Sequence, residues 1–152
     1  MKKFGFLLSL SLLALTPFNF AVADDHAGRD DAIAMVKTAI ADIKSKDAQA
    51  VYTEISNTQG KYIKGDLYLV AYDLTGKCIA HGQNAALVGK NLLPLKDVDG
   101  KAFVQERIDM AKTQQNFWQD YKYMNPTTHA VAAKQSYCEK ISDAVICGGI
   151  YK

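Results

Sequence analysis

Apolar residues recur with two different periods along the chain, and each period predicts a different kind of element. Near the amino-terminal end they return every three or four residues, at Ile33, Val36, Ile40 and Ile43. This is the spacing of one face of an α-helix. Asp47 follows a polar break, is of a type that caps a new helical turn, and precedes Val51 and Ile55 on the same stripe. The pattern predicts a long helix that is broken near Asp47.

Later apolar runs are short, rich in aliphatic and aromatic residues, and bounded by turn residues. They predict a β-hairpin followed by three antiparallel strands, in the segments 66–73, 77–81, 116–124, 131–141 and 144–151. Residues 82–100 hold many Gly, Asn, Asp and Pro residues and predict an irregular excursion, and residues 101–112 return to helical spacing. The order of elements predicts one α+β domain over residues 24–152.

Residues 1–23 have the composition of a secretory signal peptide. Lys2 and Lys3 precede an apolar run, and the small residues Ala21 and Ala23 form a cleavage signal before Asp24. No later run is long and apolar enough to predict a transmembrane helix. We therefore expect an exported, soluble protein that is cleaved after Ala23. The bacterial periplasm is its simplest destination, and outright secretion is the alternative.

Charge and motifs exclude several classes of function. The 18 basic and 16 acidic residues are interleaved, which does not predict the basic surface of a nucleic-acid-binding protein. The histidines at positions 26, 81 and 129 lack the close spacing of a metal motif, and there is no haem-attachment, dithiol or nucleophile-elbow motif. DVDG at 97–100 matches only part of a calcium loop and is interpreted as a surface turn. The sequence predicts no metal, no cofactor and no enzymatic activity.

Two of the three cysteines face each other if the last two strands form a tight hairpin. With Ser142 and Asp143 as a two-residue turn, Cys138 lies opposite Cys147 at a non-hydrogen-bonded pair, where side chains approach most closely. In an oxidising compartment this arrangement predicts a disulfide. The alternatives are two small buried hydrophobic residues, or a bond from one of them to Cys78. If the disulfide forms, Cys78 is expected to be a buried core thiol.

Several segments in succession resemble the single Cache domain of bacterial extracytoplasmic sensors. They are GDLYLVAYDLTGKCIAH, LVGKNLLPLKDVDGK and the closing GGIYK, and the resemblance runs from about Asp30 to Lys152. It implies a PAS-like fold, with a long N-terminal helix on one face of a five-stranded antiparallel sheet and a ligand pocket on the other face. Such domains bind small molecules, often short organic acids or amines, and pass the signal to a receptor.

The chain departs from the family pattern at three places. Gly82 stands where many relatives have Pro, and Met124 follows Tyr123 where relatives often have Trp and then Pro. Both lie near the expected pocket, so the identity of the ligand is not carried over. Family members usually continue into a transmembrane helix, whereas this sequence stops at Lys152. The resemblance therefore implies a stand-alone periplasmic sensor domain whose partner is a membrane sensor or a transporter.

Candidate ligand-binding residues combine a cation with aromatic walls, which a buried anion needs. Lys134 matches the strand-four lysine of the family and is expected to meet a carboxylate; a solvated strand-end lysine is the alternative. Tyr121 and Tyr123 share one strand face and are expected to line the pocket. Trp118 points to the other face and suits core or cover unless a bulge re-aims it.

The remaining candidates are hydrogen-bond donors near the same loop. His81 closes the second strand and is either a donor to the ligand or an ordinary strand-end group. Tyr68 and Tyr137 are donors if they reach the pocket, and core residues otherwise. Arg107 lies in the short helix and could supply a second cation, but a solvated helix face is the default expectation for it.

The sequence therefore predicts a periplasmic protein that binds a small carboxylate without chemistry, with residues 82–100 closing over the ligand. Two other classes compete with this function. One is a structural or protein-interaction module with a filled pocket, and the other is a redox accessory that uses Cys78 or a labile disulfide. The sequence does not decide whether two copies pair through the N-terminal helix.

Overall fold

The computed structural model describes residues 26–152, so the predicted signal peptide lies outside the described residues. In order along this part of the chain, the elements are α1 (Arg29–Ser45), α2 (Ala48–Ile55), β1 (Ile63–Lys64), β2 (Leu67–Asp73), β3 (Cys78–His81), the 3-10 helix η1 (Ala85–Leu87), α3 (Phe103–Thr113), β4 (Asn116–Met124), β5 (Val131–Ile141) and β6 (Ala144–Tyr151). Within these residues no helix has the length and apolar character needed to cross a membrane.

The N-terminal helix is broken where the sequence predicts. Helix α1 ends at Ser45, and the carboxylate of Asp47 accepts a hydrogen bond from the backbone N–H of Ala50, 3.0 Å away, to begin α2. This side-chain cap satisfies a backbone donor that has no partner inside the new helix. The predicted break near Asp47 is confirmed.

All strands belong to one antiparallel sheet with the order β1-β2-β6-β5-β4, and β3 also pairs with β2. The hairpin of β2 and β3 and the three later strands confirm the predicted α+β fold. The sheet has six strands rather than five, because the two residues of β1 pair with Leu67 and Tyr68. A strand of two residues is too short to show an alternating pattern, so the sequence gives no signal for it.

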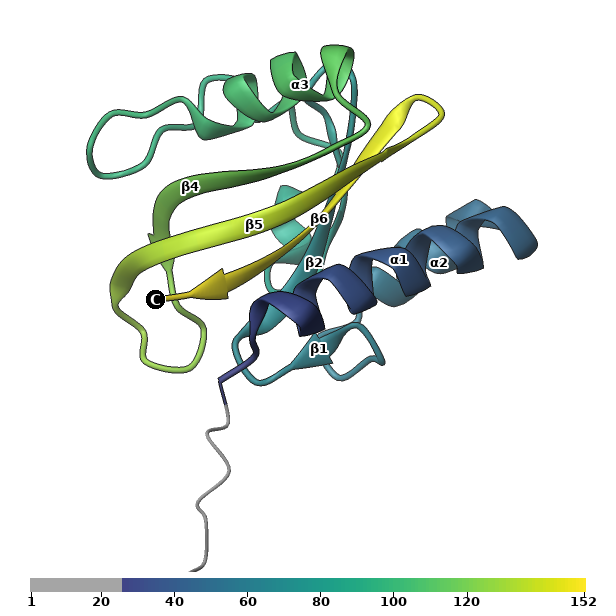
Figure 1. Cartoon of the computed structure of the whole chain (residues 1–152), viewed down its shortest axis with the longest axis horizontal. Helices are drawn as coiled ribbons and strands as arrows, with labels where there is room; N and C mark the ends of the chain where they lie inside the picture. Colours follow the sequence, from purple (N-terminus) through teal and green to yellow (C-terminus); the bar gives the residue numbers. More distant parts are fainter. Residues whose placement is uncertain (1–25) are drawn as a thin grey trace, which may run out of the picture.

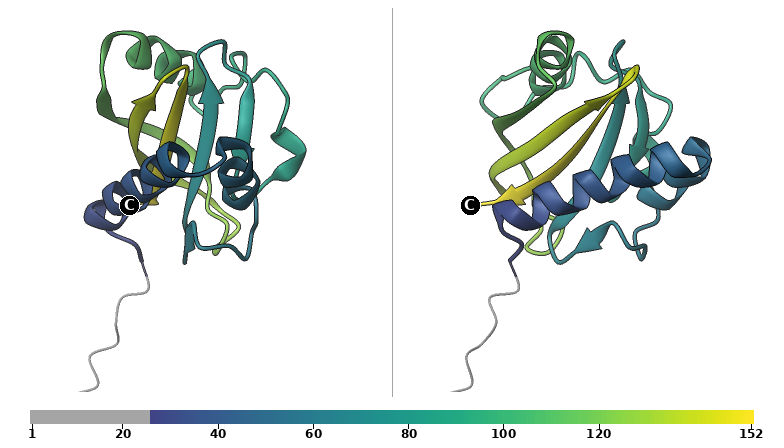
Figure 2. Two further views of the ribbon diagram at one scale, coloured as in Figure 1. Left: turned by 90° about the vertical axis from the view of Figure 1, so that its right-hand side faces the viewer. Right: turned by 45° about the vertical axis from the view of Figure 1, so that its right-hand side comes forward.

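Helices α1 and α2 lie across one face of the sheet, and α3 lies on the other (Figure 1, Figure 2). Strand β2 is buried on both faces: Leu67, Leu69 and Ala71 point toward α1 and α2, and Tyr68, Val70 and Tyr72 point toward α3. A β-carbon at Gly148 of β6 would lie 3.0 Å from the side chain of Leu69 and 3.2 Å from that of Val36. Glycine therefore permits α1 to approach the sheet closely.

The segment 82–100 is tied to the sheet at two places. The backbone N–H of Gly89 donates to the carbonyl of Cys78 over 2.7 Å, and that of Cys78 donates to the carbonyl of Lys90 over 2.9 Å. Further along, the carboxylate of Asp97 accepts from the backbone N–H of Lys122 in β4, 3.1 Å away. These contacts join the middle of the segment to the edge of β3 and its end to β4. Closure of residues 82–100 over a ligand stays a prediction.

The β5–β6 hairpin carries the predicted disulfide. Cys138 and Cys147 face each other in register, with Cα atoms 4.1 Å apart, and their sulfur atoms are bonded. The turn at Ser142 and Asp143 joins the paired residues that end β5 and begin β6. Cys78 is a buried free thiol, and burial raises its pKa to about 11, which keeps it protonated at neutral pH.

Candidate ligand-binding site

A cavity of about 280 Å³ lies where β2, β3 and the end of β4 meet the turns that follow β3 and β4. Its lining consists of Tyr68, His81, Gln83, Asn84, Tyr123, Met124, Pro126 and His129. None of these residues is acidic. A larger depression of about 490 Å³ lies between the end of α1 and the β5–β6 turn. The buried polar groups described below gather on the α3 face of the sheet and are not part of that depression.

Lys134 is a buried cation next to this cavity. Its side chain starts from β5 and is only 2% exposed. Its Nζ donates to the Tyr151 hydroxyl over 3.2 Å, and that hydroxyl donates in turn to the carbonyl of Met124 over 2.7 Å. The same Nζ lies 3.7 Å from the centre of the Tyr68 ring and 5.9 Å from that of Tyr123. Both rings line the cavity, so the ammonium lies directly behind its aromatic wall.

Gly149 makes room for this lysine. Gly149 pairs with Ser136 in the ladder between β5 and β6. A β-carbon at position 149 would collide with the Cε of Lys134 and with the hydroxyl of Ser136. The closing GGIYK segment therefore supplies a notch in which the lysine side chain lies flat on β6.

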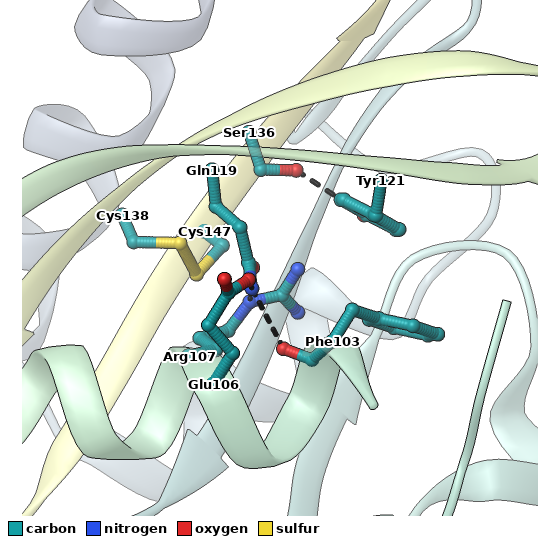
Figure 3. Close-up of a disulfide and its surroundings, with 8 residues drawn as sticks. All are labelled: Phe103, Glu106, Arg107, Gln119, Tyr121, Ser136, Cys138 and Cys147. Atoms are coloured by element: carbon teal, nitrogen blue, oxygen red, sulfur yellow. Dashed lines mark hydrogen bonds between the residues drawn. A yellow bond between two sulfur atoms is a disulfide. The ribbon is translucent and has the colours of Figure 1, made fainter. Parts of the chain in front are cut away.

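Arg107 is the second buried cation on this face, and here the sequence interpretation was wrong. The side chain was expected on a solvated helix face, but it is fully buried. Its Nε donates to Gln119 over 3.0 Å, whereas its Nη2 has no hydrogen-bond partner in the described part of the chain. Figure 3 shows the guanidinium among its neighbours, with its Cζ 5.2 Å from the centre of the Tyr121 ring and 5.7 Å from that of Phe103.

The helical spacing contained a signal for this burial. Phe103, Val104, Ile108 and Ala111 form the buried stripe of α3. Position 107 lies three residues after Val104 and four before Ala111, which places it on that stripe. A charged residue on an apolar helical stripe is the signal that could have identified the buried arginine.

His81 closes β3 as a neutral hydrogen-bond donor. Its Nδ1 accepts from the backbone N–H groups of Gln83 and Asn84, over 3.2 and 3.1 Å. The neutral ring therefore carries its proton on Nε2. Burial, followed by the charges of Lys134 and Arg107, lowers the pKa of His81 to about 4. Above that pH the imidazole is neutral and can offer one N–H to a ligand.

The tyrosines of β4 lie as strand alternation predicts. Tyr121 and Tyr123 both point toward α3. The ring of Tyr121 stacks on that of Phe103, with centroids 4.6 Å apart, and its hydroxyl lies 3.2 Å from the hydroxyl of Ser136. Tyr123 packs edge-on against Phe103 with centroids 5.8 Å apart. The structure thus brings five of the predicted residues together: Lys134, Tyr121, Tyr123, His81 and Tyr68.

Trp118 and Tyr137 are not part of this cluster. Both pack on the α1 face of the sheet, with ring centroids 5.4 Å apart. Arg29 of α1 covers the indole, with its Cζ 3.8 Å from the centre of the Trp118 ring, and the Tyr137 hydroxyl donates to Glu139 over 2.9 Å. Trp118 is separated from Tyr121 along β4, and Tyr137 from Lys134 along β5, by an odd number of residues, so strand alternation points them to the opposite face of the sheet. This placement corrects their inclusion among the ligand-binding candidates.

The site contains two buried, strongly basic side chains, Lys134 and Arg107. In residues 26–152 neither Lys134 nor Arg107 forms a salt bridge. The nearby carboxylate of Asp66 is buried and binds Asn125 and His26 through one oxygen, over 3.1 and 3.2 Å. Among the described residues, no three His, Cys, Asp or Glu side chains are placed to hold a metal ion. The site is therefore suited to an uncharged or anionic ligand.

Comparisons with known proteins agree with this fold. A sensor histidine kinase of Rhizobium johnstonii, MctS, is 32% identical over 131 residues, which are 86% of this chain and 24% of that protein. The chain thus spans about a quarter of that relative's length. A methyl-accepting chemotaxis protein of Vibrio parahaemolyticus is 27% identical in sequence, with a TM-score of 0.68 over 81% of this chain and 87% of that chain.

A further solved structure is a Cache chemosensory domain described for its recognition of carboxylic acids. It is 21% identical, with a TM-score of 0.69 over 80% of this chain and 91% of that chain, and at this identity the likeness concerns the fold alone. The family model described as single Cache domain 2 matches residues 14–151, which is nearly the whole sequence. The chain therefore belongs to the single Cache domain 2 family.

Proposed function

We propose that residues 24–152 form one periplasmic domain that binds a short carboxylate and acts in extracytoplasmic sensing, with a membrane sensor or transporter as its partner. The family is one of extracytoplasmic sensor domains, and the matched relatives are a histidine kinase and a chemotaxis protein. The carboxylic acid recognised by a Cache domain of the same fold also supports this ligand class.

One observation carries the proposal: Lys134 and Arg107 are both buried on the α3 side of the sheet, and neither forms a salt bridge with a carboxylate of residues 26–152. Burying an unpaired charge costs several kcal/mol, because the charge loses its water. A protein retains such groups where a ligand supplies the opposite charge. The free Nη2 of Arg107 and the Nε2 proton of His81 add donors that a carboxylate would accept.

The lining of the cavity favours an acid over an amine as the ligand. An ammonium group needs a carboxylate or several acceptor oxygens close by, and no acidic side chain of the part of the chain that the structure describes lines the cavity. The ligand in this proposal is therefore a carboxylate without an adjacent ammonium, rather than an amine or an amino acid. Because Lys134 lies behind the rings of Tyr68 and Tyr123, one of these rings must turn aside for the anion to reach it.

A thermal-shift screen tests the ligand class. We expect short monocarboxylates to raise the melting temperature and their uncharged amides to leave it unchanged, because the amide has the same shape but no charge for the two cations. At a concentration of about 100 times Kd, a ligand stabilises by about 2.7 kcal/mol, which is several degrees for a domain of this size. Amines and amino acids serve as further comparisons.

The screen must be run on protein that was unfolded and refolded to remove any ligand retained during purification. Equal shifts from an acid and its amide would contradict the role of the buried cations. If no compound shifts the refolded protein, the chain is better described as a protein-interaction module with a filled pocket.

The two adjacent glycines of β6 provide a matched pair of variants. Gly149→Ala is expected to weaken carboxylate binding at least tenfold, because the new methyl group displaces Lys134. Gly148→Ala places its methyl group against Leu69 and Val36 on the opposite face. It is expected to lower stability by about 1–3 kcal/mol and leave Kd unchanged.

Calorimetric binding and urea unfolding measured on both variants distinguish the two faces. The assignment of the site to the α3 face fails if Gly148→Ala weakens binding and Gly149→Ala does not.

A further inference from the structure

Lys134 is 2% exposed and forms no salt bridge within residues 26–152, so burial opposes its positive charge. It is surrounded by tyrosine rings from three strands: Tyr68 of β2, Tyr123 of β4 and Tyr151 of β6. The faces of these rings attract a cation, but they replace only part of the water that burial removes. The other charged or titratable groups that act on it are Arg107 of α3, Asp66 before β2 and His81 of β3. Asp66 is the one carboxylate among them; its Oδ2 binds Asn125 and His26, and its buried Oδ1 has no hydrogen-bond partner in the described residues.

Of the two buried cations, only the lysine can release its charge. A guanidinium stays protonated in proteins, whereas a lysine amine loses its proton readily when it is buried. Burial and the charge of Arg107 both hold the pKa of Lys134 well below its usual range, and Asp66 only partly opposes them.

The hydrogen bonds around Nζ accommodate a neutral amine. Tyr151 gives its own hydroxyl proton to the carbonyl of Met124, so its oxygen accepts from Lys134. An amine has two N–H groups and can make this bond as well as an ammonium can. Loss of one proton from Nζ therefore breaks no hydrogen bond in the described structure, and it weakens only the attraction of Nζ to the tyrosine ring faces.

We propose that the ligand-free protein holds Lys134 as a neutral amine, and that each carboxylate is bound together with one proton taken from solution. The proton adds to the lone pair of Nζ, and the ammonium so formed pairs with the anionic carboxylate. No other bond changes, and the pair is neutral overall. The inference rests on the proposed carboxylate-binding function and adds that the site responds to pH as well as to ligand concentration.

Calorimetry measures this proton directly. Titrations of the purified protein with a monocarboxylate from the screen are made at one pH in phosphate and in Tris, which differ in enthalpy of ionisation. The slope of the observed enthalpy against that ionisation enthalpy gives the protons taken up, and we expect a value close to one near pH 8. Above the ligand-free pKa of Lys134, Kd should weaken by about tenfold per pH unit.

His81 is the other group that could accept the proton, so the variant His81→Asn is measured in parallel. Asparagine keeps an acceptor for the Gln83 and Asn84 N–H groups and does not titrate. The slope should remain near one in this variant. A slope of zero in the unaltered protein, or a slope that disappears in His81→Asn, overturns the inference while leaving carboxylate binding intact.

A second measurement does not depend on calorimetric binding. The protein is labelled with carbon-13 at lysine Cε and observed by NMR, and the Lys134 signal is assigned as the one that is missing from the spectrum of Lys134→Met. Without ligand, the midpoint of its titration should lie at a pH well below the midpoints of the other lysines. Addition of the carboxylate should raise that midpoint into the range of the other lysines. A Lys134 signal that titrates with the others in the ligand-free protein contradicts the inference. If no carboxylate binds, the proposed function fails and proton uptake fails with it.

Discussion

Lys134→Met is expected to abolish carboxylate binding and at the same time to make the ligand-free protein more stable. Loss of one partner of a buried charge pair costs about 2–5 kcal/mol of binding free energy, or roughly 30-fold to several thousand-fold in Kd. Methionine fills a similar volume and has no ammonium that must be buried or deprotonated on folding, so the folded state loses a penalty. No hydrogen-bonding group is stranded, because the Tyr151 hydroxyl keeps its bond to Met124.

The gain in stability should depend on pH with a definite sign. An unfolded Lys134 has a pKa near the ordinary value of 10.5, whereas the folded pKa is lowered by burial. Between the two values the unfolded state binds more protons, so the stability of the unaltered protein rises with pH by up to about 1.4 kcal/mol per unit. The advantage of Lys134→Met is therefore largest at low pH and disappears as the pH approaches 10.5.

Urea unfolding at several pH values between about 6 and 10, together with calorimetric binding, checks both parts of this prediction. Lys37→Met is the matched control, since Lys37 is an exposed lysine on α1. A Lys134→Met protein that binds a carboxylate as well as the control would remove the lysine from the site. A variant less stable than the control at every pH would show that the charge is not a burden to the fold.

Removal of the disulfide is the change with the largest expected loss of stability. The bond joins residues nine positions apart, and closing a loop of that length stabilises by about 2–3 kcal/mol in the chain-entropy model. The double variant Cys138→Ala, Cys147→Ala also loses buried sulfur from the α3-side core. We expect a total loss of about 3–4 kcal/mol, seen as a lower urea midpoint.

A reducing agent provides the control for this experiment. It should lower the midpoint of the unaltered protein toward that of the double variant, and it should not change the double variant. A double variant within about 0.5 kcal/mol of the parent would mean that packing alone holds the hairpin. Cys78→Ala is measured separately, because that thiol is buried without a covalent partner.

The periodic part of the fold was predictable from sequence, and the irregular part was not. Helical spacing with Asp47 as a cap gave the break between α1 and α2, and alternation with a two-residue turn gave the pairing of Cys138 with Cys147. The two-residue strand β1 carries no periodic signal. The contacts of Gly89 and Asp97 that tie down the long loop join residues distant in sequence, which no local pattern contains.

The candidate site was predictable where strand alternation decides the face. Alternation separates Tyr121 and Tyr123 from Trp118, and the structure agrees. The same alternation places Tyr137 on the opposite face of β5 from Lys134, because the two positions differ by an odd number of residues. Arg107 was missed for another reason: a charged residue is normally solvated, and only its position on the apolar stripe of α3 argues against that default.

The disulfide also fixes the register between β6 and β5, the strand that carries Lys134. Lys134, Ser136 and Cys138 follow each other at intervals of two along β5, opposite Tyr151, Gly149 and Cys147 of β6. A slip of one residue between the two strands would turn Lys134 to the face of the sheet that α1 covers. The covalent bond prevents that slip several residues away from the cation. In an oxidising compartment, formation of the disulfide would therefore also fix the alignment of the residues proposed to bind the ligand, and a chain kept reduced would hold that alignment through packing alone.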